Sequence, residues 1–181
     1  MNDKNNRRNE AMAVAFVGIA AATIECAKLA LSFLPNVEVV TLLVALFGYV
    51  FGWLGVCAAF VFVCIEPLIY GFNTWVILYF LYWPALAILF MMLKKIGVKG
   101  RIPLSLVAVG STVLFGMLSS FIDTVFYLGI NEAFFRNLVL YYARGVVFYI
   151  VQITSNAVLF PLLFKFLAQK LEVIKRRMLL R

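Results

Sequence analysis

Long apolar segments alternate with short polar connections along most of this chain. A segment of about 20 apolar residues is long enough for a helix to cross the hydrocarbon core of a bilayer. Four segments reach that length, namely 11–34, 74–93, 103–128 and 138–164. The pattern therefore predicts an all-α, polytopic membrane protein rather than a water-soluble domain.

The stretch between the first two of these segments is also apolar, and its length decides the number of crossings. Residues 39–72 are too many for one crossing, and they suit two short ones, 39–52 and 55–72. The sequence G-W-L-G at 52–55 provides the turn between them, because glycine tolerates the backbone angles of a turn. No solvated linker separates the six segments, so we expect a single domain over residues 1–181.

The positions of the basic residues predict how the chain is oriented in the membrane. Thirteen of the sixteen fall into three groups, at the start of the chain, between the fourth and fifth segments, and at the end: Lys4, Arg7, Arg8, Lys94, Lys95, Lys99, Arg101, Lys165, Lys170, Lys175, Arg176, Arg177 and Arg181. Basic residues that flank apolar segments mark the cytoplasmic side of a membrane. An even number of crossings must then separate the first two groups. We therefore expect six transmembrane helices in the cell membrane, with both termini cytoplasmic.

Composition narrows the range of functions. Hydrophobic residues make up 65% of the chain and charged residues 13%, with a mean hydropathy of +1.03, far from the composition of soluble domains. The chain has no histidine, which excludes histidine bases, Ser–His and Cys–His pairs, and imidazole metal sites. A single aspartate, Asp123, lies in an apolar segment, so an aspartyl protease pair is excluded too. We expect no enzymatic activity, no metal and no cofactor.

Two further features of the composition have plain interpretations. The net charge is +8, but the basic residues lie at the ends of apolar segments rather than on a soluble face interleaved with aromatics, so we expect no nucleic-acid partner. Cys26, Cys57 and Cys64 lie within apolar segments, are odd in number and form no Cys-x-x-Cys motif. We interpret them as small buried apolar side chains.

Ionisable residues inside the apolar segments are the first candidates for function. There are five of them: Glu25, Lys28, Glu66, Asp123 and Arg144. Each costs about 2.5–3.5 kcal/mol to place in the centre of a bilayer, so each is expected to have a role. All five lie in or near the extracellular half of the expected topology. Their shared depth favours a water-filled cavity that opens to the outside.

Structural alternatives stay open for each of these residues. Glu25 and Lys28 are three residues apart and can pair within one helix. Glu66 directly precedes a proline and can accept hydrogen bonds from backbone groups that the proline frees. Asp123 and Arg144 can form a salt bridge between neighbouring helices, or one of them can hold a polar ligand.

Aromatic and small residues each form a stripe on one helix face. Trp75, Tyr79, Tyr82 and Trp83 follow i, i+4, i+7, i+8 spacing, which suits either the stacking of a planar ring or ordinary helix packing. The first segment carries two pairs of small residues separated by three others. Such pairs let helices approach closely, either within the chain or against another membrane subunit. The pairs are Ala11 with Ala15 and Gly18 with Ala22.

Several motifs together resemble a known family. They are a small-residue first helix, L-P-N-V-E at 34–38, G-x-x-x-G at 48–52, Y-G-F-N-T-W at 70–75, and S-N-A-V-L-F-P-L-L at 155–163. In this order, and with six helices and basic inner ends, they resemble the substrate-binding S component of an energy-coupling factor transporter. The resemblance implies a high-affinity binding subunit that captures a vitamin or related micronutrient from outside. It also implies a transmembrane coupling subunit and two cytoplasmic ATPases as partners.

The resemblance also implies roles for individual residues. Carried over by position, the substrate-binding residues are Asn36, Glu38, Tyr79, Trp83, Asp123 and Arg144. The residues that dock on the coupling subunit are Ala11, Ala15, Gly18 and Ala22. This chain has no G-x-x-x-x-G-K-[ST] motif, so the hydrolysis of ATP would belong to the partners.

One alternative function stays open at this point. The chain could be a small standalone secondary transporter or channel that uses Glu25, Glu66 or Asp123 as an ion relay. The absence of two matched halves with broken helices counts against this alternative. Copurification with an ATPase and a coupling subunit would favour the S component.

Overall fold

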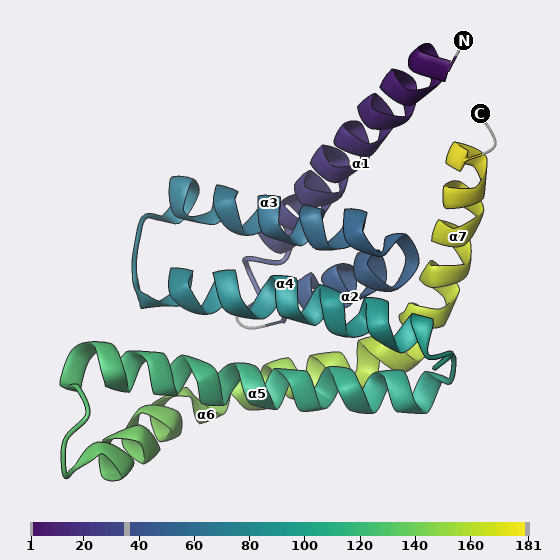
Figure 1. The fold of residues 1–181 in the computed structure, drawn as a ribbon. Coiled ribbons are helices and arrows are strands. Elements are labelled where there is room, and N and C mark those ends of the chain that lie inside the picture. Colours follow the sequence, from purple (N-terminus) through teal and green to yellow (C-terminus); the bar gives the residue numbers. More distant parts are fainter. Residues whose placement is uncertain (1, 35–36, 180–181) are drawn as a thin grey trace.

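The structure is a computed structural model, and it describes residues 2–34 and 37–179 (Figure 1). The described residues form helices and connecting turns, with no strand, which confirms the all-α prediction. Each of the six predicted segments coincides with a helix. In chain order the elements are α1 (Asn2–Ala30), α2 (Val40–Phe51), α3 (Trp53–Tyr70), α4 (Thr74–Lys95), α5 (Arg101–Leu128), α6 (Phe134–Leu159), the π-helical turn η1 (Phe160–Phe164) and α7 (Lys165–Leu179).

Five helical stretches of the described chain are long and apolar enough to cross a membrane. They are Arg7–Ala30, α3, α4, α5, and the continuous stretch Phe134–Met178 that contains α6 and η1. The sixth predicted crossing, α2, has 12 residues. At 1.5 Å per residue it is about 18 Å long, short of the roughly 30 Å of a hydrocarbon core. The α2 helix is therefore too short to be identified as a membrane crossing from its length. The number of six transmembrane helices stays a prediction.

The connections between the helices gather at two opposite ends of the bundle. Both ends of the chain lie on the side of the α4–α5 connection, while the α3–α4 and α5–α6 connections lie at the opposite end (Figure 1). The three groups of basic residues therefore belong to one end of the bundle, which we call the basic end. This arrangement agrees with the charge pattern on which the predicted orientation rests.

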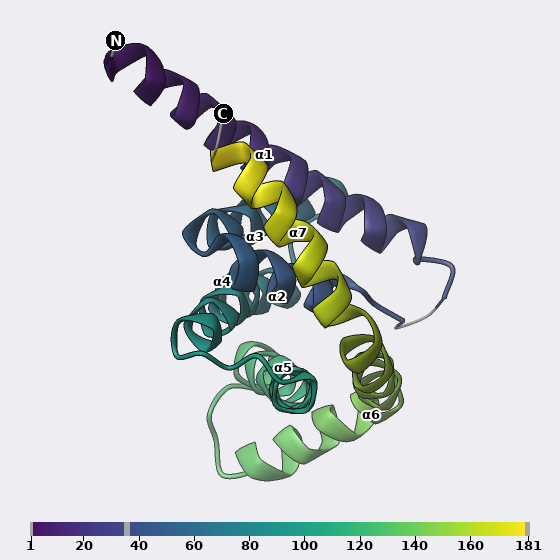
Figure 2. The same ribbon diagram turned by 90° about the vertical axis from the view of Figure 1, so that its right-hand side faces the viewer.

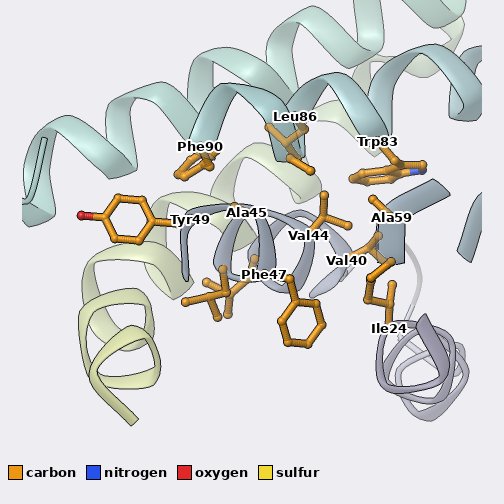
Figure 3. Packing of buried hydrophobic residues seen from close by; sticks show 14 of the residues in the cluster. Ile24, Val40, Val44, Ala45, Phe47, Tyr49, Ala59, Trp83, Leu86 and Phe90 are labelled. Atoms are coloured by element: carbon orange, nitrogen blue, oxygen red, sulfur yellow. The ribbon is translucent and has the colours of Figure 1, made fainter. Parts of the chain in front are cut away.

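The short helix α2 forms the centre of the bundle. Every residue of α2 except Leu43 is buried, and α2 contacts α1, α3, α4, α5, α6 and α7. Figure 3 shows Val44 facing Leu86 of α4, with Ile24 of α1 on another side. Because neighbouring helices cover α2 on several sides, its apolar residues form the core of the protein.

Glycines fix the two tightest features around α2. Gly52 has φ +64°, a left-handed conformation that ends α2 and lets α3 begin at Trp53. This is the turn that the sequence predicts within 52–55. Gly48 lies where α2 crosses α4, and a Cβ atom there would lie 2.3 Å from the carbonyl oxygen of Ala87. The backbones of α2 and α4 therefore touch at this point.

The outer surface of the bundle is apolar. Large hydrophobic side chains such as Val14, Leu68 and Val147 are exposed, which suits contact with lipid. Cys26, Cys57 and Cys64 belong to this surface too, since all three are exposed and free. The interpretation of the cysteines as buried side chains is wrong, because hydropathy alone cannot separate a core position from a lipid-facing one.

In the view that looks down the axis of α5, the helices α1 and α7 lie on the same side of the molecule (Figure 2). The last predicted crossing ends at residue 164, and the chain continues beyond it as the helix α7. The α7 helix is fixed to the basic end by Lys175, whose Nζ donates to the carbonyl oxygen of Val50 over 2.7 Å. An ion pair between Lys94 of α4 and Glu172 adds a second attachment.

Candidate binding site

A small cavity lies among α1, α2, α4, α5 and α6. Its volume is about 80 Å³, and its walls combine aromatic, polar and charged side chains: Lys28, Glu38, Val40, Thr41, Tyr79, Tyr82, Trp83, Thr112, Phe115 and Gln152. Three of the predicted substrate-binding residues, Glu38, Tyr79 and Trp83, are therefore brought together. Pockets for small molecules usually enclose about 300–1,000 Å³, so the cavity in this conformation is narrow.

One wall of the cavity is a cluster of aromatic rings from α4 and α5. The Tyr79 and Trp83 ring centroids are 5.5 Å apart, and those of Tyr82 and Trp83 are 4.9 Å apart. Phe115 of α5 adds a ring 5.8 Å from Trp83. The α4 rings gather as their helical spacing predicts, and edge-to-face packing against Phe115 accounts for much of this arrangement.

The opposite side of the cavity contains Glu38, in the connection that leads into α2. Its Oε2 accepts a hydrogen bond from the backbone N–H of Thr41 over 2.9 Å, which caps the first turn of α2. Its Oε1 accepts from the Thr41 hydroxyl over 2.5 Å and from Nδ2 of Asn156 over 3.0 Å. Asn156 belongs to α6, so Glu38 links the start of α2 to a helix 118 residues later. A carboxylate has about four acceptor positions, which leaves one for a ligand.

Lys28 contributes the cation of the cavity wall. Its Nζ lies 2.6 Å from Oε1 and 2.5 Å from Oε2 of Glu66 in α3, and the Glu66 side chain is 1% exposed. The expected pairing of Lys28 with Glu25 inside α1 is therefore wrong. So is the alternative that Glu66 serves backbone groups beside Pro67, because both of its oxygens accept from Lys28. Tertiary packing places a better partner opposite Lys28 than its own helix does.

Glu25 lies close to this pair and is also buried. One of its oxygens accepts a long hydrogen bond of 3.4 Å from the Tyr70 hydroxyl, while the other accepts none from residues 2–34 and 37–179. Lys28 also lies over the Tyr70 ring, 4.2 Å from its centroid. Glu25, Lys28, Glu66 and Tyr70 therefore form one cluster, which we call the α1–α3 charge cluster.

Several buried polar atoms near the cavity have no hydrogen-bond partner within the described chain. Besides the Glu25 oxygen they are the Tyr82 hydroxyl, Trp83 Nε1, Gln152 Oε1 and Asn156 Oδ1. Tyr82, Trp83 and Gln152 line the cavity directly. Folded proteins leave few buried polar groups unpaired, because each costs about 1–3 kcal/mol. Their concentration around one cavity indicates a place where polar groups of a ligand or of water are bound.

The structure does not bring the other predicted substrate residues to this cavity. Asp123 is half-buried on α5, and Arg144 is exposed on α6 with its guanidinium 5.3 Å from the Tyr141 ring. They form no salt bridge with each other, so that alternative is wrong as well. Asn36 lies outside the described residues. The cavity is also lined by four residues that were not among the predicted site residues, namely Thr41, Thr112, Phe115 and Gln152. Of these, Gln152 has a visible signal in the sequence, because it is a glutamine inside an apolar segment.

The small residues of α1 lie on a second surface, away from the cavity. Ala11, Ala15, Gly18 and Ala22 are all exposed, and Gly18 has no neighbour within 4 Å of a Cβ position. Intramolecular packing does not use this face of α1. Ala15 also lines an apolar groove of about 420 Å³ between α1 and α7. This face is therefore free to meet another helix.

Neither a metal nor a relative identifies the site further. The described residues contain no group of three or more Cys, Asp or Glu side chains that could hold a metal ion. No family model matches this chain, and no curated protein or solved structure matches it either.

Proposed function

We propose that this protein is a membrane-embedded binding subunit that captures a vitamin or related micronutrient from outside the cell. The observation that carries the proposal is the cavity whose lining residues Tyr82, Trp83 and Gln152 have buried polar atoms without partners. Aromatic walls with a few unpaired polar groups are typical of sites for small ring-containing molecules. The resemblance to S components of energy-coupling factor transporters supports the same function.

Binding a vitamin requires the cavity to widen from its present 80 Å³. Glu38 in the cavity wall is attached to α6 through a hydrogen bond from Asn156. In our proposal, ligand arrival breaks this bond, and the freed acceptor position of Glu38 turns to the ligand.

Release to the inside would depend on partners. The chain has no phosphate-binding loop, so ATP hydrolysis would take place on two ATPase subunits, connected through a transmembrane coupling subunit. The exposed small residues of α1 suit that contact, because they allow a partner helix to approach closely.

The ion-relay alternative rests on the α1–α3 charge cluster. Glu25 is buried with one oxygen unpartnered, as a proton carrier would be. Both oxygens of Glu66, however, accept from Lys28, so one of the two carboxylates of the cluster is held in an ion pair. This geometry favours a fixed structural role over a relay.

A vitamin panel tests the proposed function directly. The protein in detergent, without partners or ATP, should be stabilised by one vitamin, by about 4 kcal/mol at a thousandfold excess over Kd. The measurement is a thermal shift followed by titration. Trp83→Phe should weaken binding of that vitamin about tenfold, because it removes the unpartnered Nε1 donor. Arg144→Ala should leave its affinity unchanged.

Trp53→Phe is the matched control, since Trp53 is exposed at the start of α3 and away from the cavity. Equal effects of the two tryptophan substitutions would contradict the site. No stabilisation by any vitamin would contradict the function.

The α1 face can be tested separately. Ala15→Trp should abolish vitamin uptake by cells that supply the coupling subunit and ATPases, while the affinity of the purified chain stays the same. A large ring at Ala15 would hold the partner helix away, whereas it would not reach the cavity. Ala85→Trp is the control, because Ala85 is an exposed alanine on α4. Normal uptake with Ala15→Trp would contradict docking through this face.

A further inference from the structure

We propose that the cavity selects a positively charged, planar nitrogen heterocycle that carries N–H donors. This inference rests on the proposed function, because it names the class of substrate that the same cavity would take. It is carried by three features of the site: its net charge, the types of its unpartnered atoms, and the way in which it already holds a cation.

Carboxylates outnumber cations around the cavity. Tyr79, in the cavity wall, lies close enough to Glu25, Glu38 and Glu66 to interact electrostatically with all three. The cation that lines the cavity is Lys28, which Glu66 neutralises through a two-oxygen contact. Glu25 and Glu38 are left without a paired cation.

Glu38 is the carboxylate that lines the cavity itself. It accepts three hydrogen bonds, from Thr41 twice and from Asn156 once, and no lysine or arginine of the described chain pairs with it. The cavity wall therefore carries a carboxylate charge without a counter-ion. In a membrane interior of low dielectric, that charge attracts a cation and repels an anion strongly.

Two of the unpartnered atoms near the cavity are amide oxygens, those of Gln152 and Asn156, and the Tyr82 hydroxyl can accept as well as donate. The orientation of the Asn156 amide is fixed, because its Nδ2 donates to Glu38, which can only accept. Its Oδ1 is therefore a true acceptor without a donor, and Gln152 places a second one a helical turn earlier on α6. On the other side, Trp83 Nε1 can only donate. A ring with N–H groups along one edge and a single acceptor opposite would satisfy these atoms.

The aromatic residues beside the cavity already hold a cation. Lys28 Nζ lies 4.2 Å from the Tyr70 ring centroid and 5.8 Å from that of Tyr79. Both distances fall within the range of cation–π attraction. The rings of Tyr79 and Trp83 line the cavity, so a ligand cation there would meet the same kind of surface, with Glu38 in the same cavity wall.

Three probes with one ring skeleton separate charge from shape. They are 1-methylnicotinamide, a cation; nicotinamide, which is neutral; and nicotinate, an anion. Thiamine, riboflavin and biotin extend the test to vitamins of positive, neutral and negative charge. The Kd of each probe is measured by titration of the purified chain. In each set the cation should bind at least tenfold more tightly than the neutral member, and the anion should not bind.

The outcomes distinguish this inference from the function on which it rests. Tight binding of riboflavin or biotin, without the cations, would overturn the charge selectivity and leave a vitamin-binding function intact. Absence of binding by every probe would overturn both. Preference for the cations within both sets would support both.

A charge variant tests the role of Glu38. Glu38→Gln should weaken binding of 1-methylnicotinamide and thiamine at least tenfold, while nicotinamide binding changes less than threefold. Glu132→Gln, an exposed acid in the α5–α6 connection, is the control and should change neither. An equal loss for the cation and the neutral probe would overturn the electrostatic role and leave Glu38 as a cap of α2. If Glu38→Gln lowers the Tm of the ligand-free chain, Glu25→Gln is used in its place. The loss of affinity for the cationic probes is then compared with that for nicotinamide in the same way.

Discussion

Gly48→Ala should destabilise this protein by about 3 kcal/mol or more, a fall of roughly 6–12 °C in Tm for a chain of this size. The added Cβ would lie 2.3 Å from the carbonyl oxygen of Ala87 and 2.8 Å from its carbonyl carbon. Those are backbone atoms of α4, so no side chain can turn away to make room. Shortening Ala87 to glycine would leave the clash in place. The two helices would have to separate, and α2 is the centre of the core.

Gly110→Ala is the matched control for this prediction. Gly110 lies inside α5 with nothing within 4 Å of a Cβ position, and alanine favours a helix over glycine by about 1 kcal/mol. Its Tm should therefore stay the same or rise. Thermal denaturation of both variants in detergent makes the comparison, and equal Tm values would show that α2 and α4 do not touch through their backbones.

Much of the architecture was predictable because helix ends are local features. Gly71 and Gly129 have positive φ and end α3 and α5, and in the sequence both stand at the limits of apolar segments. The distinction between a crossing and a central helix was harder. The segment 39–52 is apolar throughout, and only the contacts of α2 with its neighbours show that it is covered by protein rather than by lipid.

Part of the candidate site was predictable, because Glu38, Tyr79 and Trp83 line the cavity, whereas Asp123 and Arg144 do not. Arg144 was selected because it lies in an apolar segment at the expected level. At about 100° per residue, it points about 80° away from Gln152 and about 120° away from Asn156 on α6. Those two residues face the bundle, so Arg144 faces outward. Asp123 misses the cavity for another reason, since it lies about 16 Å further along α5 than Thr112.

Tertiary partners were the least predictable feature. The spacing of Glu25 and Lys28 suggests a pair within α1, and only the packing of α1 on α3 reveals that Glu66 is nearer. The start of α7 was equally hidden, because the π-helical turn at Phe160–Phe164 has no signature in hydropathy. Glu38, by contrast, was selected through a family resemblance and also caps α2, a role that its position three residues before Thr41 allows.

Lys28→Met should cost about 3–5 kcal/mol of stability, the loss expected when one partner of a buried ion pair is removed. Glu66 is 1% exposed and both of its carboxylate oxygens accept from Lys28, so the substitution leaves a buried carboxylate without its cation. Glu66→Gln should cost less, because the Lys28 side chain is 27% exposed and its ammonium can turn toward water. The order of the two effects follows from burial alone.

The double variant Lys28→Met/Glu66→Gln isolates the interaction itself. A glutamine opposite a methionine leaves no buried charge, so the double variant should be more stable than Lys28→Met alone, with a coupling energy of about 2 kcal/mol. Lys95→Met, at an exposed position at the end of α4, controls for the loss of a positive charge and should change the Tm little. Thermal unfolding of the unsubstituted protein, the two single variants and the double variant in detergent supplies the cycle. Additive effects of the two single substitutions would mean that Lys28 and Glu66 do not interact, and the α1–α3 charge cluster would then lose its ion pair between helices.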